Sequence, residues 1–214
     1  MDRECEKWLW AQWAGTCMKN LKKNGFDALF VENAESARAN IMERFSSYET
    51  YGVGGSDTIR KIGILDDLRK MGKPVYDHWA DGLSGEKELE IRLLQGRCDC
   101  FFCSANAVAL TGEIVNVDGI GNRNNAMTFG PKKVVIVAGM NKMAADLPAA
   151  LKRVHDIAAP MRARSLGMKT PCAETGVCTD CHVPQRICRI TTILHRRPAL
   201  TDISVILINE SLGF

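Results

Sequence analysis

The apolar residues of this chain follow two spacings in turn, and the alternation indicates a class of fold. Near the N-terminus they recur every three or four residues from Cys5 to Leu21, as in an amphipathic helix that the Asn24-Gly25 pair ends. Short apolar or β-branched runs then predict strands at residues 26–31, 51–53, 75–76, 99–104, 113–117, 133–138 and 203–208. Between them, helical spacing predicts helices at residues 35–45, 57–71, 85–95, from 124 onward and at 142–165.

Strands that alternate with helices are typical of an α/β fold with a mostly parallel sheet flanked by helices. The continuous β-branched run at 133–138 fits a central strand that is buried on both faces. We therefore predict an N-terminal helix at 1–25, followed by one α/β domain at 26–214. A cysteine-rich segment at 171–190 is the one departure from this pattern, and we interpret it as an insertion near the end of the domain.

Three tryptophans, Trp8, Trp10 and Trp13, lie in the first predicted helix. Large aromatic side chains of this kind dominate the energetics of cores and interfaces. Packing onto the body of the domain is the simpler interpretation. Docking onto a second copy of the chain, which would make a homodimer, is the alternative.

Composition narrows the classes of function. Apolar residues make up 46% of the chain and charged residues 25%, which is ordinary for a globular domain and excludes a disordered or coiled-coil protein. The net charge of +3 gives no electrostatic reason to expect binding to nucleic acid or to a membrane. The N-terminal segment lacks the apolar stretch of a signal peptide, and the apolar run at 134–140 is too short to span a bilayer. We expect a soluble, cytoplasmic protein with reduced thiols.

A glycine-rich turn, Gly54-Gly55-Ser56, joins a predicted strand to a predicted helix. Glycines at such a turn let a ligand approach the backbone, and the amides at the start of a helix face an anion. The turn has neither the three spaced glycines of a dinucleotide site nor the Gly-Lys-Ser/Thr of a P-loop. The alternative is a tight turn with Ser56 as an ordinary helix cap.

A second polar segment follows the strand predicted at 113–117, where ligands sit in open α/β sheets. Asp118 could act as a general base or orient a hydroxyl, Arg123 could clamp a carboxylate or phosphate, and Glu113 is a second candidate acid or base. The alternative is a plain turn in which Asp118 caps backbone amides. The candidate ligand-binding residues around them are Asn116, Gly119, Gly121 and Asn122.

The chain has nine cysteines, and the last four predict a metal site. A Cys-x-x-Cys pair with two outlying cysteines can hold either a tetrahedral zinc or an iron–sulfur cluster, and the neighbouring His182 is an alternative ligand. A Cys-x-x-Cys pair without a metal is the competing interpretation. The predicted ligands are Cys172, Cys178, Cys181 and Cys188.

Three further cysteines fall in the apolar strand predicted at 99–104 or just before it. In that setting cysteine behaves as a small apolar residue, so we expect Cys98, Cys100 and Cys103 to be buried. Along a strand, Cys98 and Cys100 would share one face and Cys103 would point to the other. His78 follows another strand and could be catalytic, although a structural role is the simpler expectation.

At three segments the sequence resembles the lactate-utilisation (LUD-domain, LutC-like) family, in particular a small stand-alone branch with a C-terminal cysteine motif. The segments are VGGSDTIRKIGI, CFFCSANAVALTGEIVNVDGIGNRNNAMTFGPKKVVIVAGMNKM and PCAETGVCTDCHVPQRIC. The resemblance begins near Phe26 and implies a fold like that of the NagB/RpiA/CoA-transferase group. It also implies that the Gly54–Ser56 turn holds an anionic group opposite the segment from Asn116 to Arg123.

Three functions compete at this stage. Members of the family are associated with oxidation of lactate to pyruvate within an iron–sulfur complex. This chain would then be an iron–sulfur subunit with a 4Fe-4S cluster that binds a small anionic substrate and passes electrons to redox partner subunits. The second function is an isomerase or transferase acting on a phosphate- or CoA-bearing substrate through Asp118 and Glu113, with a structural metal such as zinc. The third is a non-catalytic module that binds a small carboxylate.

Overall fold

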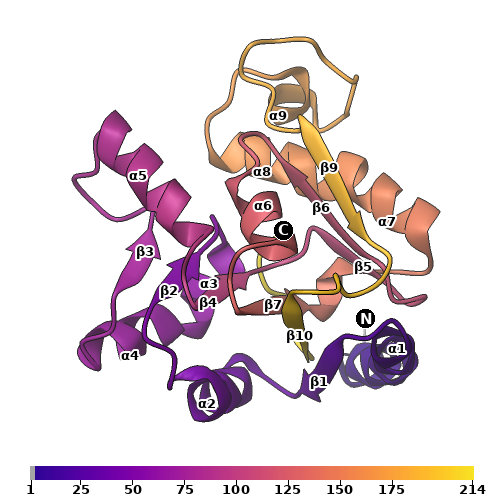
Figure 1. Ribbon diagram of the computed structural model, residues 1–214. Helices are drawn as coiled ribbons and strands as arrows, with labels where there is room; N and C mark the ends of the chain where they lie inside the picture. The colour runs from indigo at the N-terminus through magenta and orange to yellow at the C-terminus, as the bar shows by residue number, and fades with distance from the viewer. Residues whose placement is uncertain (1–2) are drawn as a thin grey trace.

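The main sheet has six strands, and every neighbouring pair is parallel. The structure is a computed structural model that describes residues 3–214, so the first two residues of the predicted helix at 1–25 lie outside it (Figure 1). The strand order is β1-β10-β7-β4-β2-β3, which confirms the predicted α/β class with a mostly parallel sheet. The strands are β1 (Asp27–Val31), β2 (Tyr51–Val53), β3 (Val75–Asp77), β4 (Cys100–Cys103), β7 (Lys133–Gly139) and β10 (Asp202–Ile208).

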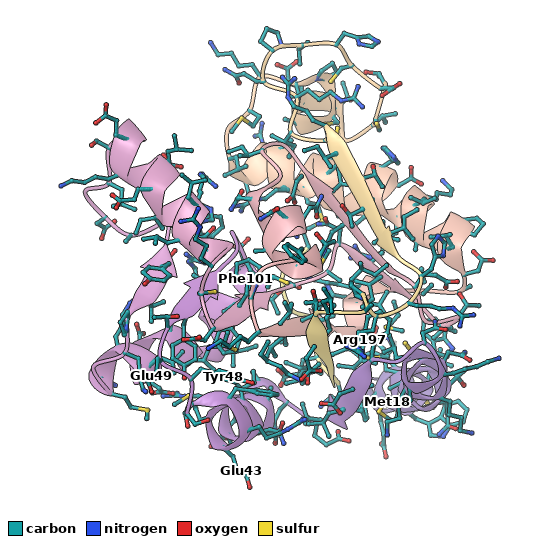
Figure 2. All side chains as sticks on the ribbon, in the orientation of Figure 1. Met18, Glu43, Tyr48, Glu49, Phe101 and Arg197 are labelled. Carbon is teal, nitrogen blue, oxygen red and sulfur yellow. The ribbon has the colours of Figure 1, made fainter. Side chains whose placement is uncertain are left out.

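Strand β7 is central to the hydrophobic core because its side chains alternate between the two apolar clusters on opposite faces of the sheet. All seven of its residues are buried. Val134 and Ile136 pack in one apolar cluster with residues of helix α1 (Arg3–Lys23). Val135 and Val137 pack on the other face, against helices α2 (Ala34–Phe45), α3 (Asp57–Ile62) and α4 (Ile64–Lys70). Figure 2 shows Phe101 inside the molecule, whereas Glu43 of α2 points away from it.

A second, four-stranded sheet was not predicted. Its order is β8-β5-β6-β9, with β5 parallel to β8 and the two other pairs antiparallel. Only β6 corresponds to a predicted strand, the one at 113–117. The short strands were missed because two or three residues carry no visible period. The strands are β5 (Ala107–Ala109), β6 (Ile114–Asp118), β8 (Met143–Ala144) and β9 (Ile190–Leu194).

Two predicted helices are divided in the structure. The helix predicted at 57–71 is split at Gly63, whose φ of 83° ends α3 and precedes α4. The helix predicted at 142–165 begins only after Asp146, which caps it by accepting a hydrogen bond from the amide of Ala149 at 2.8 Å. The remaining helices are α5 (Gly85–Gln95), α6 (Asn122–Thr128), α7 (Leu147–Arg153), α8 (Ala159–Ser165) and α9 (Pro171–Thr175).

Between α7 and α8 the chain forms a π-helical segment, Val154–Ala158. Pro160 lies in the first turn of α8 and has no amide hydrogen, so the α-helical hydrogen bond from position 160 to the carbonyl of Asp156 cannot form. The wider turn keeps the helix continuous past this gap.

Helix α1 packs on one face of the main sheet, but fewer of its apolar residues are buried than the helical pattern predicted. Ala14, Cys17 and Leu21 are fully buried. Trp10 packs partly against this core, whereas Trp8 is 64% exposed. The homodimer that these tryptophans suggested stays a prediction. Within residues 3–214, no helix has the length and apolar character needed to cross a lipid bilayer.

The cysteines around β4 are buried as predicted, but their predicted facing is wrong. Cys98 and Cys103 belong to the cluster beneath α1, whereas Cys100 belongs to the cluster on the opposite face. The strand starts only at Cys100, and Cys98 lies in the turn before it with its thiol donating to the carbonyl of Gln95 at 3.2 Å. The alternation of a strand therefore does not extend back to Cys98.

Candidate functional site

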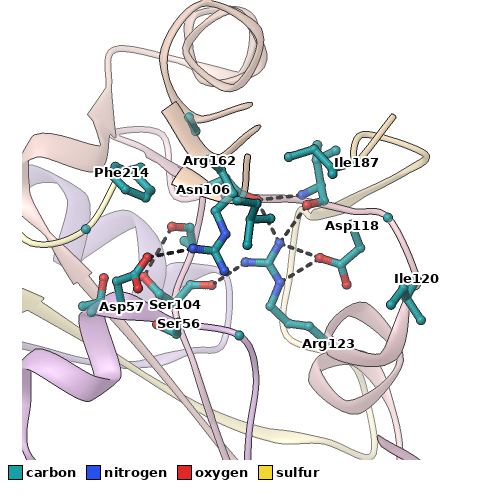
Figure 3. A pocket seen from close by; sticks show the side chains of 18 of the residues that line it. Ser56, Asp57, Ser104, Asn106, Asp118, Ile120, Arg123, Arg162, Ile187 and Phe214 are labelled. Carbon is teal, nitrogen blue, oxygen red and sulfur yellow. Dashed lines mark hydrogen bonds and ion pairs between the residues drawn. The ribbon is translucent and has the colours of Figure 1, made fainter. Parts of the chain in front are cut away.

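A cavity of about 370 Å³ lies where the carboxyl ends of β2, β4 and β6 approach one another. Residues 55–58 after β2, 104–106 after β4, and 117–120 with 122–123 at the end of β6 line it. Lys142 adds to the lining. Further walls come from Arg162 of α8 and from Phe214, both labelled in Figure 3. The carboxyl ends of parallel strands are the usual ligand position in α/β sheets, and both predicted segments reach it.

The glycine-rich turn contributes to the cavity through two of its three residues. Gly55 and Ser56 line it, whereas Gly54 lies behind the wall, where a Cβ would come within 3.3 Å of Cγ of Arg123. The Ser56 hydroxyl oxygen accepts a hydrogen bond from the amide of Ile59 at 3.2 Å and so caps α3. Gly55 leaves room for an indole, since a Cβ there would stand 2.8 Å from Cζ2 of Trp79. The missing side chain at position 55 thus lets the indole of Trp79 form part of the cavity wall.

Asp118 and Arg123 meet at the edge of the cavity as a buried ion pair. Oδ1 of Asp118 accepts from Nε of Arg123 at 2.8 Å and from Nη2 at 2.5 Å. Oδ2 accepts from the amide of Asn124 at 2.9 Å. Arg123 also donates to the side chain of Asn106 and to the carbonyl of Ser104. These contacts favour the capping alternative for Asp118; its catalytic role stays a prediction.

Glu113 and Asn116 do not reach the cavity. Glu113 precedes β6 at the end opposite Asp118, and its carboxylate accepts a hydrogen bond from the hydroxyl of Thr111. Five residues of strand separate the two carboxyl groups by roughly 17 Å, which is too far for both to act on one small substrate. Asn116 is fully buried, and its side chain accepts a hydrogen bond from the amide of Asn106 at 2.9 Å.

A hydrogen-bonded chain links Asn122 to His78 on the α5 side of the cavity. Asn122 accepts from Nη1 of Arg92 at 3.2 Å and donates to Oε1 of Gln95 at 2.9 Å. Nε2 of Gln95 lies 2.9 Å from the carbonyl of Val53 and 2.9 Å from Nδ1 of His78, so Nδ1 acts as the acceptor. Burial, followed by the charge of Arg92, lowers the pKa of His78 to about 4. His78 is therefore neutral at pH 7.

Three cations that line the cavity, Arg92, Arg162 and Lys142, were missed by the sequence reasoning. The guanidinium of Arg162 lies over the ring of Trp79 at 4.6 Å, and its Nη1 donates to Oδ2 of Asp57 at 3.1 Å. Helical spacing alone gave no sign that Arg162 faces a cavity. Lys142 could have been noticed, because an Asn-Lys pair follows the strand predicted at 133–138, at its carboxyl end.

The four candidate metal-binding cysteines lie on the loop that carries α9, next to α8 at the top of Figure 1. Burial raises the pKa of Cys188, and the nearby thiols of Cys178 and Cys181 raise it further. Sγ of Cys178 is also 3.7 Å from Nδ1 of His155. Within residues 3–214, no group of three or more His, Cys, Asp or Glu side chains is arranged closely enough to hold an ion. The metal site at Cys172, Cys178, Cys181 and Cys188 stays a prediction.

The end of the cysteine segment also forms a wall of the cavity. Ile187 lines it, and a Cβ on Gly119 would come within 3.1 Å of the carbonyl oxygen of Ile187. The amide of Arg189 donates to the carbonyl of Asp118 at 2.9 Å. Glycine at position 119 therefore lets the two segments touch. A conformational change in the cysteine loop would therefore move residues that line the cavity.

The chain therefore has an α/β fold with a parallel main sheet and a cation-lined cavity at the strand ends, where α/β proteins usually bind ligands. The LUD-domain family model matches residues 16–208, so the chain belongs to the LUD-domain family. The chain is also similar in fold to a DUF162 family protein from Deinococcus radiodurans, known from a crystal structure at 1.70 Å resolution. That similarity has a TM-score of 0.54 at 15% identity and covers 93% of this chain and 98% of the other. No curated protein matches the chain.

Proposed function

We propose that this protein binds a small carboxylate, lactate or a related hydroxy acid, in the cavity and takes part in its oxidation as an iron–sulfur subunit. The LUD-domain family is associated with lactate utilisation, which supports this substrate class. The observation that carries the proposal is the free hydrogen-bonding capacity of Arg162. Within residues 3–214, only its Nη1 makes hydrogen bonds, so Nε and Nη2 remain for a ligand.

Arg162 suits a carboxylate better than Arg123, the residue favoured by the sequence. Arg123 uses Nε and both terminal nitrogens within the protein, chiefly on Asp118. Arg162 offers two adjacent donors, and a guanidinium holds a carboxylate most strongly through two parallel hydrogen bonds. Trp79 lies beneath it as a flat support, a contact that cation–π attraction stabilises.

The charge balance of the cavity favours an anion. Its two lining carboxylates are paired, Asp118 with Arg123 and Asp57 with Arg162. Arg92 is a third arginine in the lining, and Glu88, its carboxylate partner, is not among the lining residues. Among the described residues the lining arginines therefore outnumber the lining carboxylates, and an anionic ligand would meet an excess of positive charge.

The cysteine loop supports the redox part of the proposal by its position. Ile187 of this loop lies in the cavity wall, one residue before the predicted ligand Cys188. When bound there, an iron–sulfur cluster would accept and pass on electrons. Oxidation of a hydroxy acid to a 2-oxo acid releases two electrons, and a cluster accepts one electron at a time. Redox partner subunits would therefore be needed as the final acceptors of both electrons. The isomerase or transferase alternative is less well supported, because Glu113 lies outside the cavity.

Calorimetric titration with lactate and with pyruvate tests the proposal. The wild-type protein should bind at least one of them, and Arg162→Gln should bind it about tenfold or more weakly, because a charge-assisted bidentate contact is lost. Arg164→Gln is the matched control, since Arg164 lies on the same helix and is exposed. No binding of either carboxylate, or equal affinity in both variants, would refute the proposal. Binding of phosphate esters in their place would favour the isomerase or transferase alternative.

A further inference from the structure

Two lysines at opposite ends of β7 are equally buried but have different partners. Lys133 is 5% exposed, and its Nζ pairs with Oδ2 of Asp202 at 2.9 Å. Lys142, just after the strand, is 3% exposed, and its Nζ donates to Oγ of Ser104 at 2.8 Å and to Oγ1 of Thr58 at 3.0 Å. A buried ammonium with no carboxylate partner is costly, because two hydroxyl groups do not neutralise its charge.

The surroundings of Lys142 favour the unprotonated amine. Burial is the largest cause of its lowered pKa, which is about 7, and the positive charges of Arg153 and Arg123 add to it. Asp57 and Cys103 act in the opposite direction without offsetting these effects. At neutral pH a substantial fraction of such a lysine is the neutral amine, whose lone pair makes it a competent nucleophile.

Lys142 and Arg162 line the same cavity from different elements, a short 3-10 helix after β7 and helix α8. A 2-oxo acid presents a carboxylate next to a keto carbon. The keto carbon is bonded directly to the carboxylate, so a molecule held on Arg162 keeps its keto carbon inside the cavity that Lys142 also lines. The site therefore offers one group for each end of such a molecule.

We propose that Lys142 forms a covalent imine with a 2-oxo acid, such as pyruvate, whose carboxylate is held by Arg162. The inference rests on the proposed function, since a 2-oxo acid is the product of hydroxy-acid oxidation. Nζ attacks the keto carbon, and one amine proton passes to the carbonyl oxygen, which becomes a hydroxyl group. The C–O bond then breaks, and the hydroxyl group leaves with the second amine proton as one water molecule while the C=N bond forms. The step consumes no oxidant or reductant. The Ser104 and Thr58 hydroxyl groups lie where they can carry these protons.

Reductive trapping tests the imine. Wild-type protein is incubated with pyruvate and sodium cyanoborohydride at pH 7, and the adduct is mapped by peptide mass spectrometry. We expect one reduced pyruvate adduct, located on Lys142 and absent from Lys133. Lys142→Arg keeps the positive charge and the hydrogen-bond donors but cannot form an imine, so it should retain its fold and yield no adduct at this position. Lys142→Gln provides a second variant if Lys142→Arg folds poorly, with circular dichroism as the check.

Calorimetry on the same samples separates the two proposals. Pyruvate binding that depends on Arg162, with no adduct on Lys142, would overturn the imine and leave the proposed carboxylate site standing. An adduct spread over exposed lysines as strongly as over Lys142 would overturn it as well. Absence of any carboxylate binding would instead refute the proposed function, and the inference with it.

Discussion

Asp118 and Arg123 are joined by two hydrogen bonds, from Nε at 2.8 Å and from Nη2 at 2.5 Å, across a turn at the edge of the cavity. Both side chains are largely buried. The pair closes the turn between β6 and α6, and the same Asp118 accepts the amide of Asn124 at the start of that helix. This part of the cavity wall is therefore held by an ion pair within the protein and does not need a bound ligand.

Asp118→Asn should destabilise the protein by about 3 kcal/mol, because it leaves the Arg123 charge buried without its partner. Urea unfolding followed by circular dichroism measures the change. Asp67→Asn is the control: Asp67 pairs with Arg38 at the surface, and losing that pair should cost less than about 1 kcal/mol. Equal effects of the two substitutions would contradict the structural role of the buried pair.

His78→Asn should reduce the loss of stability in mild acid. The pKa of His78 is lowered from 6.5 to about 4 in the folded protein, so the unfolded chain takes up the proton first as the pH falls. Wild-type stability is therefore lost between these two values, by about 2 kcal/mol from pH 7 to pH 5. Asparagine cannot titrate, and its side-chain oxygen can still accept from Gln95. Urea unfolding at both pH values should show the smaller difference for the variant; an unchanged difference would count against a neutral, buried His78.

Gly55→Ala and Gly15→Ala should have opposite effects. A Cβ at position 55 would stand 2.8 Å from Cζ2 of Trp79, so the indole must shift from beneath Arg162, and both stability and carboxylate affinity should fall, the former by about 1–3 kcal/mol. At position 15, inside α1, a Cβ would meet nothing within 4 Å, and alanine should stabilise the helix by about 0.5–1 kcal/mol. Thermal unfolding and calorimetry check both variants. Tolerance of alanine at position 55 would show that the glycine is not needed for this contact.

The double variant Cys178→Ser, Cys181→Ser should lose the metal that the cysteine loop is predicted to hold. Two thiolate ligands are removed at once, and hydroxyl groups are poor ligands for zinc or for iron–sulfur clusters. Anaerobic purification followed by visible absorption and by iron, sulfide and zinc analysis gives the measurement. Iron with matching sulfide would identify a cluster, and stoichiometric zinc without colour would identify a structural ion. Cys5→Ser, an exposed cysteine outside the loop, is the control; unchanged metal content in the double variant would exclude these ligands.

Several features of the fold were predictable because they are local. The β-branched run at 133–138 became the buried strand β7, and Ser56 caps α3 as its position before a helical pattern suggested. The second sheet was not predictable in this way. Strand β6 pairs with β9, from Ile114 with Leu194 to Asp118 with Ile190, so its hydrogen-bond partners lie far along the chain. Strand β9 is stabilised by that pairing and not by a pattern of its own.

By itself, the sequence determined the α/β class, the family, and the segments that reach the carboxyl ends of the strands. The class and the segments follow from periods of two and 3.6 residues and from the common direction of parallel strands, whereas the family was indicated by the resemblance at three segments. Only the tertiary structure decided which charged groups face the ligand. In the folded chain Arg123 pairs with Asp118, and Glu113 lies at the opposite end of β6. Packing brings Arg162, from a distant part of the chain, next to Asp57. Whether an arginine can bind a ligand depends on which of its N–H donors already bond to neighbouring residues, and the local spacing of the sequence carries no information about these neighbours.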